Sequence, residues 1–167
     1  MAINVRVTGT KELMQALARA GARAEMAAKA ALYQEAERVM AQSKQEAPVG
    51  VDGVLRASGF VELPKPAGRG WRVTLGYGGA AKSYAAVIHE GRTPGKRPPP
   101  SKAIEPWVKK KMGVPADEVA GVAFVVARSI GKKGTRPTKF LERPLNAAAA
   151  GMASRMAKRI RAQMERK

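Results

Sequence analysis

The sequence of 167 residues predicts an α+β fold, and two kinds of apolar spacing lead to this prediction. Residues 10–46 and 144–167 repeat apolar side chains at the period of an amphipathic helix. Residues 3–7 and 71–75 alternate apolar and polar side chains, which is typical of strands. We therefore expect a long N-terminal helix and a C-terminal helix packed on a small, mostly antiparallel β-sheet. The whole chain is expected to be one domain, with a helical insertion at residues 94–135.

The N-terminal strand ends at Gly9, and Thr10 is a suitable N-cap for the helix that follows. An unbroken helix over residues 10–46 would be roughly 50 Å long, which is more than one small domain needs. Gly21 leaves a second arrangement open, in which a bend separates two shorter helices. The alanine-rich middle favours close packing against another helix, in the same chain or in a neighbouring subunit.

Residues 47–58, with the sequence APVGVDGVLRAS, form a turn that ends this helix and begins the β-rich part of the chain. Pro48 disfavours continuation of the helix, and Gly53 completes a turn dipeptide with the preceding aspartate. Leu55 supplies an apolar anchor, and Arg56 is expected to point away from it.

A β-hairpin is predicted over residues 60–75, with a Pro-Lys-Pro interruption at residues 64–66 and a flexible glycine-rich tip at residues 67–70. The apolar run that follows at residues 83–91 is short. Either one helical turn or a short strand ending at Gly91 fits it.

The proline-rich residues 92–101 predict an extended, solvated loop. A short helix at residues 102–112 follows, with Pro106 in its tolerant first turns, and another helix spans residues 115–133. The expected apolar face of that second helix consists of Val119, Val122, Val125 or Val126, and Ile130.

Residues 138–141 predict a short extended segment, and Pro144 is suited to open the last helix, which continues to residue 167. An apolar stripe at i+4 spacing marks that helix and consists of Met152, Met156, Ile160 and Met164.

Positive charge is concentrated in the second half of the chain. Lys and Arg total 31 against 13 Asp and Glu, giving a net charge of +18. Such an excess indicates a polyanionic partner, either nucleic acid or an acidic protein surface. Aromatic residues make up only 5% of the chain, which argues against a stacking platform for single strands. The candidate contacts are Lys109, Lys110, Lys111, Lys132, Lys133, Arg155 and Arg159.

The residues of an enzyme are missing. The chain has no cysteine and a single histidine, His89, so neither a thiolate zinc site nor a histidine cluster is expected. Ser83 and His89 lack the orienting acid and oxyanion donors of a nucleophilic pair, and a packed or surface-facing imidazole is the simpler expectation. The glycines at 76, 78 and 79 are not followed by the Lys-Ser/Thr of a phosphate-binding loop. No catalysis, cofactor or metal is expected, and an unrecognised enzyme is the weakest alternative.

The N-terminus lacks a secretory signal, and no apolar run is long enough to cross a membrane, so the expected compartment is a cytosol.

Three short motifs follow one another along the chain. After the long helix come Ala-Pro and Gly-x-Leu-Arg-x-Ser, here Pro48, Gly53, Leu55, Arg56 and Ser58. Tyr-Ala and Glu-Gly-Thr come next, here Tyr84, Glu90 and Gly91, with Arg92 inserted before Thr93. A Phe-Leu pair precedes the last helix, here Phe140 and Leu141. Their order and spacing resemble the tailed-phage neck and tail-completion proteins, a family related to minor tail protein Z of lambdoid phages.

This resemblance implies a structural role in the virion, assembled in the host cytoplasm. Members form a ring, here expected to be hexameric, between the head-closure or connector proteins and the tail terminator or tail tube, and the genome passes through its centre. Whether the ring holds six or twelve subunits stays open. The candidate subunit contacts are Leu13, Leu17, Ala24, Ala28, Met152, Met156 and Ile160.

The excess of positive charge supports an alternative, a basic protein that binds nucleic acid without sequence specificity. The two functions are compatible, because basic side chains of a ring either contact double-stranded DNA or bind acidic neighbouring proteins.

Overall fold

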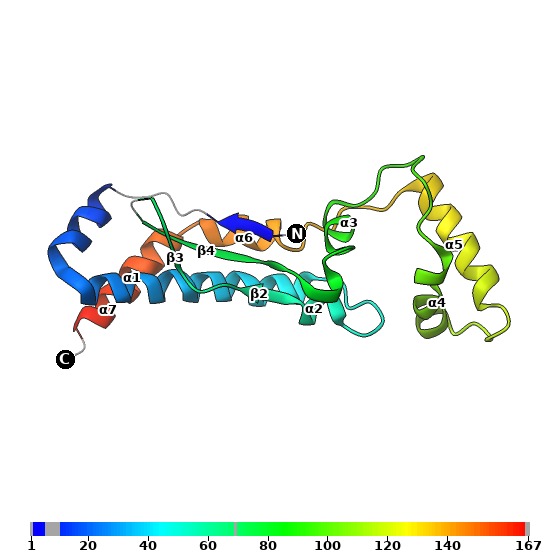
Figure 1. Cartoon of the computed structure of the whole chain (residues 1–167), viewed down its shortest axis with the longest axis horizontal. Helices are drawn as coiled ribbons and strands as arrows, with labels where there is room; N and C mark the ends of the chain where they lie inside the picture. The colour runs from blue at the N-terminus through cyan, green and yellow to red at the C-terminus, as the bar shows by residue number, and fades with distance from the viewer. Residues whose placement is uncertain (1, 6–10, 69, 166–167) are drawn as a thin grey trace. The chain divides into compact units, whose positions relative to one another are not determined.

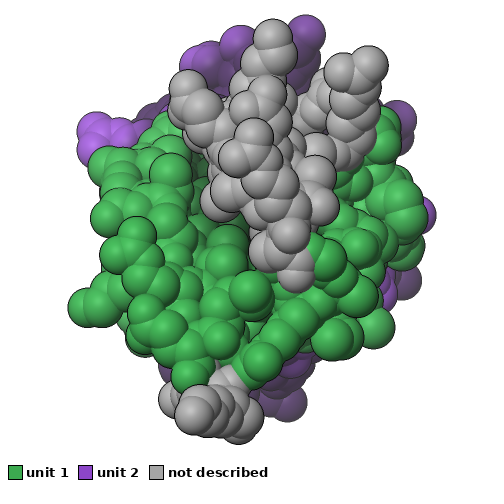
Figure 2. Space-filling model, turned by 90° about the vertical axis from the view of Figure 1, so that its left-hand side faces the viewer, with its two compact units in different colours: residues 1–46, 59–78, 140–167 green, residues 47–58, 79–139 purple. Residues whose placement is uncertain are grey.

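A computed structural model describes residues 2–5, 11–68 and 70–165, with side chains from residue 21 onward (Figure 1). It confirms the α+β class, with a long N-terminal helix, a C-terminal helix and a small antiparallel sheet. The chain forms two compact units (Figure 2). Unit 1 comprises Met1–Glu46, Gly59–Gly78 and Phe140–Lys167, and unit 2 comprises Ala47–Ser58 and Gly79–Lys139. The expected insertion at residues 94–135 lies within unit 2.

The long helix α1 spans Lys11–Glu46 and is interrupted at Gly21. Gly21 has φ 73° and ψ −165°, a backbone conformation that an L side chain rarely adopts. Of the two arrangements that the sequence allowed, the structure therefore has the one with a bend.

The sheet of unit 1 is centred on β4, Gly70–Tyr77, which pairs antiparallel with β1, Ala2–Val5, and with β2, Gly59–Val61. The predicted N-terminal strand is thus confirmed for its first residues, and Val7 lies outside the described residues. The Pro-Lys-Pro segment, expected to interrupt the hairpin, instead contributes β3, Lys65–Ala67, which also pairs with β4. Proline is tolerated there because β3 needs hydrogen bonds on one edge only.

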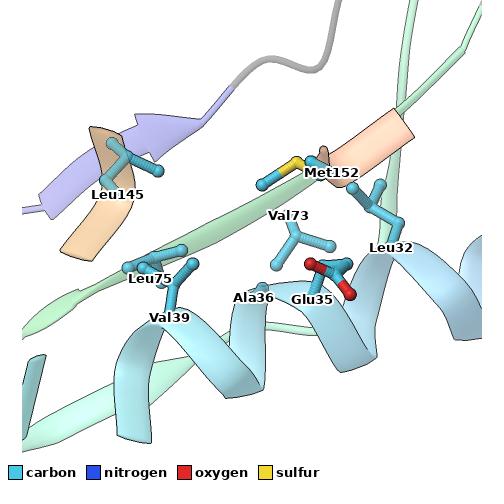
Figure 3. Close-up of a pocket in the computed structure, with 8 residues that line it drawn as sticks. All are labelled: Leu32, Glu35, Ala36, Val39, Val73, Leu75, Leu145 and Met152. Carbon is cyan, nitrogen blue, oxygen red and sulfur yellow. The ribbon is translucent and has the colours of Figure 1, made fainter. Parts of the chain in front are cut away.

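Three helices accompany this sheet. Helix α1 packs along β4 and β2 and also contacts α6, Glu142–Ala149, and α7, Met152–Glu165 (Figure 1). The sequence predicted one C-terminal helix, but the chain breaks it at Gly151, whose φ is 76°. The small core between α1, β4 and the C-terminal helices is lined by Leu32, Val39, Val73, Leu75, Leu145 and Met152 (Figure 3).

Unit 2 is mainly helical. It contains α2, Val54–Ala57, α3, Ala85–Glu90, α4, Glu105–Met112, and α5, Val119–Lys133. Single 3₁₀ turns lie at Gly79–Ala81 and Ser101–Ala103. Residues 83–91, left open by the sequence, are therefore helical, and the predicted turn at residues 47–58 contains a helical turn of its own.

Helix α5 differs from its prediction in two respects. It begins at Val119 rather than at residue 115, and its buried side consists of Val119, Ala123, Ala127 and Gly131. Small residues are buried there because neighbouring segments approach closely: a Cβ on Gly131 would lie 2.8 Å from the ring of Pro98. Val125, one of the two alternatives for the apolar face, is 65% exposed.

The predicted short extended segment at residues 138–141 is also corrected. No strand forms there; the chain turns at Lys139, which has φ 51°, and leads into α6.

Candidate interaction surfaces

The Gly-x-Leu-Arg-x-Ser motif forms one closed helical turn. Gly53, at φ 66°, precedes α2, and Leu55 is buried beneath it. The hydroxyl of Ser58 donates to the carbonyl of Leu55 at 2.8 Å. Arg56, expected to point away, turns back instead, and its Nε donates to the carbonyl of Ala47 at 2.7 Å. The motif therefore fixes the path of the chain on both sides of Pro48.

The Glu-Gly motif forms a second joint, at the end of α3. Gly91 has φ 73°, and the next residue, Arg92, forms an antiparallel bridge with Thr135, with N···O distances of 3.1 and 3.0 Å. Glu90 accepts from the Lys139 Nζ at 2.6 Å, and its other oxygen lies 2.9 Å from the His89 Nδ1. The hydrogen bond from Lys139, followed by that with His89, lowers the pKa of Glu90 below its ordinary value.

His89 itself is buried, with 1% of its surface exposed, so the imidazole is packed rather than surface-facing. Ser83, by contrast, is exposed.

The Phe-Leu motif belongs to the core of unit 1. Phe140 and Leu141 are each 1% exposed, and the Phe140 ring meets the Tyr77 ring edge-on at 4.9 Å. The Tyr77 hydroxyl lies 2.8 Å from the Ser43 Oγ on α1. These contacts give the third motif a packing role.

Three motif residues converge on an open groove in unit 2. Pro48, Leu55 and Tyr84 line it together with Trp107 from α4, and its volume is about 390 Å³. We call it the Trp107 groove. Its walls are mostly apolar, and burial raises the pKa of the Tyr84 phenol.

Lys110 of α4 connects the two sides of the Trp107 groove. Its Nζ donates to the Val51 carbonyl at 2.5 Å and lies 3.5 Å from the Asp52 carboxylate. The sequence did not predict this groove, because it depends on the folding of residues 48–54 beside α4. The only local signal was the presence of several valines in a turn.

The residues expected at a subunit contact are largely internal. Met152, Met156 and Ile160 are at most 8% exposed, on a helix that packs against α1, and Ala24 is 2% exposed. Ala28 is half-buried, whereas Leu13 and Leu17 lie where no side chains are described. The stripe residues Met152, Met156 and Ile160 are therefore part of the core of the chain itself.

Two of the predicted polyanion contacts, Arg155 and Arg159, form ion pairs within unit 1. Glu35 of α1 is fully buried beside Leu32 and Met152 (Figure 3). Arg155 donates to its Oε2 from Nε at 3.0 Å and from Nη2 at 2.8 Å, and the Arg159 Nη1 lies 2.8 Å from its Oε1. Arg155 also donates to the carbonyls of Ala148 and Ala150. These arginines therefore compensate a buried carboxylate.

The predicted lysine contacts differ from these two arginines in being exposed. Lys109 and Lys111 on α4, and Lys132 and Lys133 at the end of α5, are exposed. Lys110 is also exposed, but it differs in that its Nζ contacts residues 51 and 52. Five of the seven predicted cations are thus exposed to a polyanion, and Lys110 is the one of these five that contacts residues 51 and 52.

Large apolar side chains are exposed in both units. In unit 2 they include Phe124 and Val125, 55% and 65% exposed, on the outer side of α5. Trp107 and Met112 of α4 are 40% and 50% exposed, and Leu63 of unit 1 is 70% exposed.

None of the helices in the described part of the chain is long and apolar enough to cross a membrane. Comparison of the chain with models of known families, with curated proteins and with solved structures finds no match.

Proposed function

We propose that this protein is a structural component of a tailed-phage virion, in which identical copies form a ring in the neck at the head–tail junction. DNA passes through the ring, and the neighbours are head-closure or connector proteins on one side and the tail terminator or tail tube on the other. The resemblance of the three motifs to neck and tail-completion proteins supplies this identity.

Exposed apolar surface is the observation that carries the proposal of self-association. Monomeric proteins seldom expose contiguous apolar patches, and such patches mark interfaces. Here Phe124 and Val125 are adjacent and more than half exposed, and Trp107 lies in an open groove. A chain that assembles with copies of itself would cover both surfaces.

The positions of the motif residues support a structural role. Arg56, Ser58 and Gly91 fix the course of the backbone, and Phe140 fills a core. Residues with these roles determine the conformation of the chain, and a ring of identical copies needs the same conformation in every subunit.

Electron microscopy of the purified protein, with light scattering for mass, tests the proposal. We expect closed rings of hexameric symmetry. Protein that stays monomeric at every concentration, and is absent from purified virions, would overturn it.

The exposed lysines favour a second function, non-specific binding of double-stranded DNA. If six lysines or arginines contact phosphates, log K should fall against log salt with a slope of about −5. Replacing Lys109, Lys111, Lys132 and Lys133 by Gln should reduce this slope by about 0.9 for each cation that contacts a phosphate. The matched control is Lys65→Gln, because Lys65 is exposed but lies in unit 1 and donates to Glu62 at 2.6 Å, and we expect it to leave the slope unchanged. Absence of binding at low salt would exclude this function.

A further inference from the structure

Unit 2 carries two unlike apolar surfaces that complement each other. The first is the Trp107 groove. The second is the outer side of α5, which we call the α5 patch and which consists of Ala120, Gly121, Phe124 and Val125. All four patch residues are exposed, and they share one side of α5 because they are separated by one, three, four or five positions.

We infer that the α5 patch of one copy docks into the Trp107 groove of the next. This inference rests on the proposed self-association and names the surfaces through which it occurs.

The shapes of the two surfaces fit this contact. The α5 patch presents a protruding Phe124, and the residues one turn before it, Ala120 and Gly121, are small enough for another chain to approach the helix. A Cβ added at Gly121 would meet nothing within 4 Å. The groove, at about 390 Å³, has room for an aromatic side chain and lies between a valine-rich loop and α4. Its Trp107 and Tyr84 belong to residue types that are enriched at interfaces.

The charges at the edges also fit. Asp52 lines the Trp107 groove, and its side chain is 68% exposed. Arg128 is exposed one helical turn after Phe124, on the same side of α5. In the inferred contact, the partner helix is oriented so that Arg128 approaches the Asp52 carboxylate, which Lys110 contacts at 3.5 Å and leaves largely exposed. Opposite charges thus favour this one orientation of the partner helix.

A second copy is favoured over an unrelated protein because each chain carries both surfaces. One type of contact therefore covers the groove of one copy and the patch of the next. When a single patch–groove pair joins two copies, the contact is heterologous, and its repetition produces a ring when the rotation closes. An isologous dimer, in contrast, would need both patch–groove pairs to form at once between the same two copies, and its mass by light scattering would be that of a dimer.

Cysteine crosslinking tests the contact directly, since the chain has no cysteine of its own. Val54 lines the groove and Val125 lies on the patch, and both are exposed. Full-length Val54→Cys and Val125→Cys proteins are purified separately, mixed, allowed to assemble, and treated with a short bismaleimide. We expect a crosslinked dimer in the mixture and little in either protein alone. The matched control mixes Val125→Cys with Leu63→Cys, whose position is more exposed than Val54, 70% against 38%, but lies in unit 1.

A crosslink in Val125→Cys alone, or an equal yield in the control mixture, would overturn this contact. The same experiment distinguishes this interface from the proposed function. Wild-type rings without the mixed crosslink would agree with a ring but contradict this interface. A monomeric wild-type protein would contradict both the ring and the interface.

An independent measurement uses the exposed Phe124, whose replacement disturbs no core. Phe124→Asp should raise the dissociation constant of assembly by roughly 30-fold, as expected for a central interface residue, with the circular dichroism spectrum unchanged. Leu63→Asp should leave it within about threefold of wild type. A Phe124→Asp protein that assembles like wild type would contradict the inference.

Discussion

A side chain at position 91 meets two obstacles. Gly91 has φ 73° and ψ −172°, a region populated almost exclusively by glycine. In addition, a Cβ would collide with the Thr135 carbonyl oxygen and lie 2.7 Å from the Pro137 nitrogen. The close approach exists because residues 92 and 135 pair directly after Gly91.

Gly91→Ala should therefore lower the free energy of unfolding by about 3 kcal/mol or more. Gly113→Ala is the matched control in the same unit, because Gly113 has φ 62° but open space around it. It should cost only about 1 kcal/mol, the strain of the left-handed region. Urea denaturation measures both, and equal losses would show that the contact with residues 135–137 does not constrain position 91.

The Glu90 carboxylate should respond to pH in a defined direction. Its pKa is lowered, first by the hydrogen bond from Lys139 and then by that with His89, from an ordinary value of 4.5. A depressed pKa in the folded state means that the charged carboxylate stabilises the fold above pH 4.5. This contribution is lost as the pH falls through the lower, folded pKa.

Nuclear magnetic resonance titration of Glu90 should therefore give a midpoint below 4.5, and Lys139→Met should move that midpoint upward. His89 remains in both proteins, so the difference reports Lys139 alone. A midpoint that Lys139→Met leaves unchanged would assign the shift to another group.

The attachment of α7 to α1 depends on a buried charge. Glu35 is fully buried on α1, and Arg155 of α7 supplies two hydrogen bonds to it as well as bonds to the carbonyls that end α6. Removal of Arg155 leaves the buried Glu35 carboxylate with Arg159 at 2.8 Å as its remaining close cation. A buried charge with too few partners costs more free energy than the intact pair contributes to stability.

Arg155→Met should accordingly destabilise the protein by about 3 kcal/mol. Arg38→Met is the control, because Arg38 is half-exposed and lies 3.8 Å from the same carboxylate, so its loss should cost less than about 1 kcal/mol. Adding Glu35→Met to Arg155→Met should restore part of the stability, since the fully buried carboxylate is then absent and the charge that loses its partner, Arg159, is 36% exposed. Further destabilisation in the double variant, measured by thermal unfolding, would contradict this account.

The same elements show how far sequence reasoning extends. Some features follow from local sequence signals, namely apolar periodicity and the backbone preferences of proline and glycine. These features are helix α1 with a possible bend at Gly21, the strand containing Trp71–Leu75, and the short helix containing Pro106. The burial of Ala123 and Ala127 in place of Val125 does not follow, because it depends on the segment that packs against α5.

The candidate sites divide in the same way. Arg155 and Arg159 are indistinguishable from surface cations in the sequence, since their partner Glu35 is more than a hundred positions away. The Trp107 groove joins residues 48–55 to α4 through the fold of unit 2, and no local pattern predicts that contact. Conversely, the motif residues were identified by resemblance, and the structure adds the contacts that each of them makes.

The molecule as a whole combines two compact units, and both leave large apolar side chains exposed, Leu63 in unit 1 and Phe124 in unit 2 among them. Unit 1 buries the methionine stripe and compensates its buried charge internally. Unit 2 leaves the Trp107 groove, Phe124, Val125 and the five predicted lysine contacts accessible. In the function proposed above, unit 1 would maintain the fold and unit 2 would make the contacts, apolar ones with copies of the chain and ionic ones with a polyanion.

These two kinds of contact respond oppositely to salt. At 1 M ionic strength the Debye length is about 3 Å, so lysine–phosphate attraction is largely screened, whereas burial of apolar surface is not weakened. Light scattering from 0.1 to 1 M NaCl should therefore find the assembled mass unchanged, while binding to double-stranded DNA disappears over the same range. Dissociation to monomers at 1 M would mean that ionic contacts hold the subunits together. The exposed lysines of unit 2, rather than Phe124 and the groove, would then be the surface through which copies associate.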